Sequence, residues 1–125
     1  MITRFRAWHK TWEEMGKVKR IRFGDDGNVT TVLFKDETLG ANLKIDEIEL
    51  MQSTGLLDKN EQEIFEGDIL KDGSEYGRAV YDPDRTMWRV YGKDFDDALS
   101  DWWTGRVVGN IYENPELLEA DHDRD

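Results

Sequence analysis

The stretch that decides the fold is residues 50–70, which read LMQSTGLLDKNEQEIFEGDIL. Two apolar runs flank a polar cluster at 58–61, a pattern typical of a hairpin turn in which Asn60 takes the left-handed conformation. A second turn follows at 66–68, where Gly67 supplies positive φ, and Ile69 begins a new strand. A chain that turns twice in so short a span predicts a small, sharply curved sheet.

Short apolar segments divided by turns continue towards the C-terminus, as in a small barrel or sandwich. Phe95, Leu99 and the tryptophans that follow recur at helical spacing, so a short helix or structured loop is expected within 93–103. Asn114, Pro115 and Glu116 predict a helical turn over 115–118. The expected strands are 69–71, 78–82, 87–91 and 106–111.

The N-terminal part predicts a meander of strands over 2–9, 17–23 and 29–35. Gly16 is the expected pivot of the first connection, and Asp25-Asp26-Gly27-Asn28 is the clearest short hairpin signal. In the second strand, Ile21 and Phe23 are expected on one face and Val18 with the arginines on the other. Residues 43–51 are ambiguous; we expect a short turn and then a strand from about Glu47 to Ser53.

Composition excludes several classes of site. The chain has 125 residues and no cysteine, which rules out disulfides, cysteine-type zinc sites and thiol catalysis. No apolar run approaches the roughly 18 residues of a membrane span, and the N-terminus lacks the apolar core of a signal peptide. We therefore expect a protein of the cytoplasm, in contact with no membrane.

Two blocks, 50–70 and 107–118, resemble the YopX family of phage and prophage proteins, and Arg4-Phe5-Arg6-Ala7-Trp8 is similar to that family's opening. The departure is Glu61, where the family's hairpin more often carries glycine. The resemblance implies an SH3-like β-barrel and no established activity. We thus expect a mainly β fold with one domain over 1–119: an N-terminal β-meander and connection (2–49), an SH3-like barrel core (50–112) and a helical turn (113–119). Residues 120–125 are expected to be disordered.

The net charge of −11 is unevenly placed. Residues 1–22 carry seven Lys or Arg against Glu13 and Glu14, a net of +5, so the remainder sums to −16. Such a split gives the two parts complementary fields. It predicts either a basic strand lying on its own acidic domain, or head-to-tail contact between subunits or with another charged partner.

Nucleic-acid binding is the alternative that this basic region suggests. Its cations could neutralise phosphates while aromatic rings stack on bases, although the acidic remainder repels the same polyanion. The inverse hypothesis is that the acidic surface mimics DNA. The residues concerned are Arg4, Arg6, Lys10, Lys17, Lys19, Arg20 and Arg22, with Phe5, Trp8, Trp12 and Phe23.

A carboxylate site is the enzymatic alternative. Acidic residues near Asp94 have the oxygen ligands that a divalent-metal-dependent hydrolase needs, but their spacing matches no EF-hand loop, and a chain with 28 acids forms such clusters by chance. His9 is more typical of a surface residue beside Trp8 than of a base. We expect no catalytic residue, metal or cofactor. The acidic residues are Asp82, Asp84, Asp94, Asp96, Asp97, Asp101 and Glu113.

Adjacent tryptophans at 102 and 103 cannot both face the same way, so at least one is expected at a surface or interface; Trp88 is expected in the core. With the phage or prophage origin that the resemblance implies, we expect a non-enzymatic accessory protein that binds itself and an unknown host or phage protein. The expected interaction surface comprises Arg4, Arg6, Trp8, Lys19, Arg20, Arg22, Trp102 and Trp103.

Overall fold

The structure is a computed structural model that describes residues 4–34 and 41–119. Its strands are β1 (Phe5–His9), β2 (Glu14–Phe23), β3 (Val29–Phe34), β4 (Ala41–Lys44), β5 (Ile48–Leu57), β6 (Glu63–Phe65), β7 (Asp68–Asp72), β8 (Glu75–Asp82), β9 (Met87–Gly92), β10 (Asp96–Ala98) and β11 (Arg106–Asn110). Three 3₁₀ helices are described: η1 (Ile45–Glu47), η2 (Leu99–Trp102) and η3 (Pro115–Leu118). The mainly β fold class is confirmed, and η3 matches the predicted helical turn. The predicted disordered tail at 120–125 lies outside the described residues.

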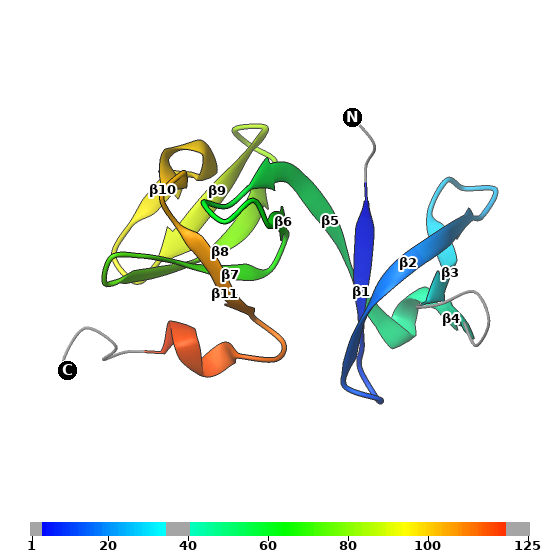
Figure 1. The fold of residues 1–125 in the computed structure, drawn as a ribbon. Helices are drawn as coiled ribbons and strands as arrows, with labels where there is room; N and C mark the ends of the chain where they lie inside the picture. Colours follow the sequence, from blue (N-terminus) through cyan, green and yellow to red (C-terminus); the bar gives the residue numbers. More distant parts are fainter. Residues whose placement is uncertain (1–3, 35–40, 120–125) are drawn as a thin grey trace. The chain divides into compact units, whose positions relative to one another are not determined.

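The chain divides into two compact units, residues 1–52 and 53–125. The boundary falls inside β5, whose first half pairs with β1 and whose second half pairs with β6 (Figure 1). A single domain over 1–119 stays a prediction, as does the SH3-like character of 50–112.

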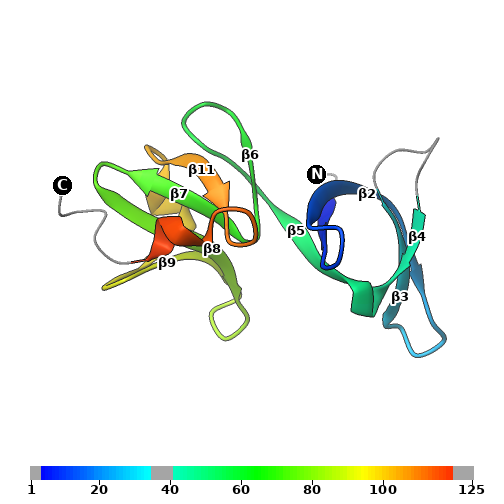
Figure 2. The same ribbon diagram turned by 90° about the horizontal axis from the view of Figure 1, so that it is seen from below.

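In the first unit, β1 to β5 form an antiparallel sheet in the order β4-β3-β2-β1-β5, which curls on itself in Figure 2. The inward faces supply a core of alternating residues, as the period of a half-buried strand requires. The predicted short turn and strand from about Glu47 correspond to η1 and β5, and β4 is the strand that the sequence did not predict. The core is Ala7, Val32, Phe34, Leu43 and Ile48.

A bulge in β2 corrects the predicted faces of that strand. Val18 pairs with Phe34 and Arg20 with Leu33, so Lys19 is an extra residue. Val18 and Ile21 consequently both pack on the core. A second register shift after Arg22 leaves Phe23 63% exposed, so the prediction that Phe23 shares a face with Ile21 is wrong.

The turns correct two further predictions. Gly16 lies within β2 opposite Ala7, and Glu13, at φ 55°, takes the positive-φ position of the first connection. In the turn at 58–61 it is Glu61, at φ 65°, and not Asn60 that is left-handed. The left-handed backbone at this position explains why the hairpin of the resembling family more often has glycine there, since glycine adopts that conformation without steric cost.

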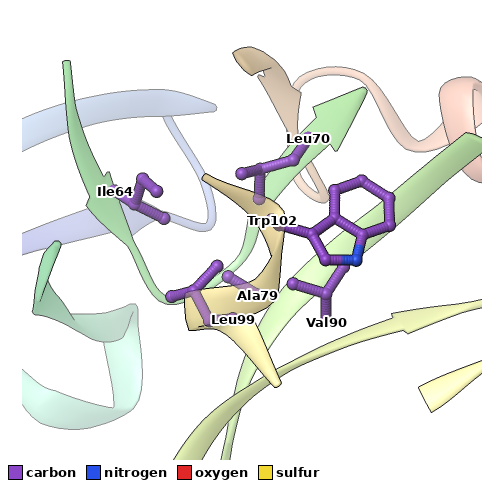
Figure 3. Packing of buried hydrophobic residues seen from close by; sticks show 6 residues of the cluster. All are labelled: Ile64, Leu70, Ala79, Val90, Leu99 and Trp102. Carbon is purple, nitrogen blue, oxygen red and sulfur yellow. The ribbon is translucent and has the colours of Figure 1, made fainter. Parts of the chain in front are cut away.

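In the second unit, β7 to β11 form a sheet in the order β10-β9-β8-β7-β11. The core cluster gathers Ile64, Leu70, Ala79, Val90, Leu99 and Trp102 (Figure 3), with Trp88, Phe95 and Val107 packed against it. The segment predicted as one short helix or loop is therefore β10 followed by η2. Trp88 is partly buried, and it packs against this core as predicted.

The block at 107–118 is held by side-chain amides. Asn110 Oδ1 accepts hydrogen bonds from the backbone N–H groups of Tyr112 (3.0 Å) and Glu113 (2.8 Å), and Asn114 Oδ1 accepts from Asn110 N (3.2 Å). A Cβ on Gly109 would lie 2.5 Å from Asn114 Oδ1, so only glycine fits there. These contacts give the resembling block a structural explanation.

Candidate functional site

The two adjacent tryptophans have opposite environments. Trp102 is 4% exposed, stacks on Phe95 with ring centroids 5.4 Å apart, and donates its indole N–H to Asp97 Oδ2 at 3.0 Å. Trp103 is 74% exposed. Of the two tryptophans predicted at an interaction surface, Trp102 therefore lies in the core and Trp103 lies at the surface.

The backbone on both sides of Trp103 is held in place. Trp102 is in the core, Thr104 Oγ1 donates to Asp72 Oδ2 (2.8 Å), and the carbonyl of Gly105 accepts from Lys59 N (3.0 Å). Trp103 therefore projects from a fixed segment. A side chain on a rigid backbone loses little conformational entropy when it binds a partner.

Asp58 fixes the loop that faces this segment. Its Oδ1 accepts from the N–H groups of Asn60 and Gln62 (both 2.8 Å), and its Oδ2 accepts from Val107 N (2.9 Å). Burial favours the neutral carboxyl, but these backbone hydrogen bonds, with the nearby charge of Lys59, outweigh it and lower the pKa of Asp58. The charged Asp58 is thus a structural clasp between the β5–β6 turn and β11.

Two apolar side chains precede this clasp. Leu56 is 40% exposed and Leu57 is 56% exposed. The Lys59–Gly105 bond joins the turn after Leu57 to the segment after Trp103. We call the exposed residues of these two joined segments, Leu57, Glu61, Asp101 and Trp103, the Trp103 patch. Leu57 was missed because it reads as an ordinary strand residue.

The predicted basic residues lie on the central strands of the first unit. Arg4, Lys19, Arg20 and Arg22 are exposed, whereas Arg6 and Trp8 on β1 are half-buried. Arg6 stands opposite Lys17 in the pairing of β1 with β2, so the sheet brings cations of the two strands together. Of the aromatic residues predicted with this region, the structure exposes Phe23, the last residue of β2, and Trp12, two residues before β2, which is 51% exposed.

His9 is not a surface residue beside Trp8. It is 3% exposed, and its ring stacks on that of Trp12, with ring centroids 3.9 Å apart and an interplanar angle of 7°. Its Nδ1 accepts a hydrogen bond from the backbone N–H of Trp12 at 3.0 Å. The alternation of β1 turns His9 to the same side as Ala7, into the core. With Nδ1 an acceptor, the proton of a neutral ring sits on Nε2.

The family described as YopX protein matches residues 4–119 of the chain. The chain belongs to the YopX family. A comparison with curated proteins gives no match. The crystal structure of protein EF1440 from Enterococcus faecalis is similar, with a TM-score of 0.71 and 29% identity, over 95% of this chain and 99% of that one.

In this YopX-family chain, the aspartates proposed as a metal site have other contacts. Asp96 accepts from Arg89 Nε (2.8 Å) and Arg85 Nη1 (2.9 Å), and Asp97 holds the indole of Trp102. Burial raises the pKa of Asp96, but the bonds from the two arginines outweigh it and lower the pKa overall. Within residues 4–34 and 41–119, no group of three or more His, Cys, Asp or Glu side chains is placed to hold a metal ion. The same residues contain no helix long and apolar enough to cross a membrane.

Proposed function

We propose that this YopX-family protein is a non-enzymatic accessory protein of a phage or prophage that acts in the host cytoplasm. It binds protein, including a second copy of itself. The observation that carries this proposal is Trp103, an aromatic side chain that is 74% exposed on a fixed segment. Exposed, pre-organised aromatic residues are the usual centres of protein interfaces.

The neighbourhood of Trp103 supports the same function. Leu57 is a second exposed apolar side chain, on the segment that the Asp58 clasp and the Lys59–Gly105 bond hold to the Trp103 segment. Both segments also carry exposed acidic residues, Glu61 and Asp101, and apolar side chains accompanied by polar ones are the composition of a protein interface.

Light scattering of the purified chain at rising concentration tests this function. We expect a mass above that of the monomer, and a return to the monomer for Trp103→Ser. Tyr81→Ser is the matched control, since Tyr81 is the other aromatic residue classed as exposed within residues 53–119, at 38%. A strict monomer at high concentration would remove self-association from the proposal.

The basic surface favours a second candidate, binding of single-stranded nucleic acid. Exposed cations along β2, with Trp12 and Phe23 at its ends, provide charge for phosphates and rings for bases. Fluorescence anisotropy of a labelled single strand at low salt is the test, with Arg4→Ala and Lys19→Ala expected to weaken binding. An unchanged anisotropy at low salt would end this candidate.

A further inference from the structure

We infer that the self-association is head-to-tail: β2 of one copy binds the Trp103 patch of the next copy. This inference rests on the proposed function and specifies its two surfaces. One of these surfaces lies in each compact unit.

The two units have very different charges. Residues 1–52 contain nine Lys or Arg and nine Asp or Glu, whereas residues 53–125 contain eight Lys or Arg and nineteen Asp or Glu. The whole net charge of −11 therefore belongs to the second unit. Within the first unit, the acids near β2 stand at its ends, in the turns around Glu13 and Asp25, which leaves the middle of the strand basic.

The bulge at Lys19 shapes the basic surface. It turns Val18 and Ile21 inwards and leaves Arg20 and Arg22 exposed. The next register shift exposes Phe23 directly after Arg22. The strand thus exposes guanidinium groups and, one residue further along, an aromatic ring, which suits a partner with both carboxylates and an aromatic side chain.

The Trp103 patch has this composition. Asp101 is exposed two residues before Trp103, and Glu61 is exposed in the turn that follows Leu57. Arginine stacks on tryptophan and pairs with carboxylates, so Arg20 and Arg22 match the patch in both respects. A symmetric contact between two patches would instead bring Asp101 and Glu61 of both copies together, and like charges across an interface oppose binding.

Two different surfaces on one chain give a heterologous contact, which builds rings or open filaments. Because the contact joins two different surfaces, mutation of either surface should block it. Arg20→Glu with Arg22→Glu removes the basic surface and keeps the patch; Trp103→Ser with Asp101→Lys removes the patch and keeps the basic surface.

The decisive experiment is light scattering of these two double variants, alone and mixed in equal amounts. We expect each variant alone to be monomeric, and the mixture to form a dimer and nothing larger, because only one intact contact remains. Added salt should weaken the wild-type association. Arg78→Glu with Lys93→Glu is the control, since it makes the same change in net charge within the second unit and should leave association intact.

The outcomes separate the inference from the proposed function. If the wild type associates but the Arg20/Arg22 variant still does, or the mixture stays monomeric, the head-to-tail contact is wrong and self-association stands. If the wild type is a monomer, the inference fails together with the self-association part of the proposed function. If the Arg20/Arg22 variant loses binding of a labelled single strand and keeps its association, β2 serves nucleic acid and the inference is overturned. Circular dichroism checks the fold, and Arg20→Gln with Arg22→Gln and Trp103→Gln replace any variant that does not fold.

Discussion

The two units share one strand order and differ in how their cores are closed. In each, an antiparallel meander of four strands leads into a single 3₁₀ turn, and a fifth strand returns to pair with the first. In the second unit, η2 places Leu99 and Trp102 in the core. In the first unit, η1 buries no residue, and the aromatic residues near the core are Phe34, His9 and the half-exposed Trp12.

This difference teaches that the strand order does not decide which surfaces are free. A 3₁₀ turn that inserts an indole leaves the adjacent residue, Trp103, facing outwards on a fixed backbone. In the first unit, η1 contributes no buried side chain, and the stacked rings of His9 and Trp12 cover the core instead. The Trp12 ring remains partly exposed to solvent. Each unit thereby presents a different aromatic surface on the same plan.

The largest effect should come from removing the tryptophan that closes the second unit. We expect Trp102→Ala to lower the free energy of unfolding by about 3–5 kcal/mol, because it leaves a cavity against Phe95 and Leu99. Ile45→Ala in η1, the corresponding turn, should change it by no more than about 0.5 kcal/mol. Urea unfolding followed by circular dichroism measures both. Equal losses of unfolding free energy in Trp102→Ala and Ile45→Ala would contradict the proposed difference between the two 3₁₀ turns.

The next effect concerns the clasp, which belongs to the second unit. Asp58→Asn should cost about 1–3 kcal/mol, since the amide that replaces one oxygen leaves the N–H of Val107 or of Asn60 and Gln62 without an acceptor. Asp25→Asn, in an exposed turn of the first unit, is the control. A variant as stable as the wild type in urea would show that the carboxylate is dispensable.

The clasp also predicts how stability depends on pH. Because the folded pKa of Asp58 is lowered, its stabilisation is complete above the unfolded value of about 3.9 and is lost as pH falls through the folded pKa. Wild type should therefore lose stability faster than Asp58→Asn as the pH falls below about 4. Urea midpoints at several acidic pH values give the two slopes; parallel slopes would contradict the assignment.

A smaller effect is expected from the stacked pair that closes the first unit. His9→Ala removes the acceptor of the Trp12 N–H and one face of the stack, and should cost about 1–2 kcal/mol. The measurement is again urea unfolding, with tryptophan emission as a second probe. Thr11→Ala, at an exposed neighbouring position, should leave both unchanged; an equal loss there would point to the turn and not to His9.

The smallest effect should come from the ion pairs of Asp96. These groups are exposed, and exposed pairs contribute little because solvent and salt screen them. We expect Asp96→Asn to leave the melting temperature nearly unchanged, and any difference from wild type to vanish in high salt. A large loss that persists in salt would mean that Arg89 depends on Asp96 for its packing.

Much of this fold follows from local pattern. The alternation of β1, the two-residue hairpin after Asp72 and the cap-proline signal of η3 are set by neighbours in sequence, so they could be predicted. The faces of β2 could not, because its bulges arise from pairing with β3 and leave no mark on the strand's own alternation. For His9, alternation gives the side shared with Ala7, but its contacts with Trp12 and Phe34 depend on the following turn and on β3, which strand periodicity does not place beside it.

The candidate site was predictable only in part. Adjacency alone implied that Trp102 and Trp103 face apart, but which one is buried depends on Phe95 and Asp97, which approach through η2 and β10. The exposure of Leu57 follows from the clasp at Asp58, whose partner Val107 is 49 residues away in sequence. Contacts at such separations have no local signature.

The unit boundary inside β5 has a consequence for proteases. Cleavage needs several residues of extended chain to leave their hydrogen-bonded neighbours and enter the enzyme. Between residues 48 and 52 the backbone is hydrogen-bonded to β1, so a protease cannot cleave this segment unless the strand first separates from β1. When opening and closing are fast relative to cleavage, the rate of scission at that point would report the fraction of molecules in which this strand is locally open.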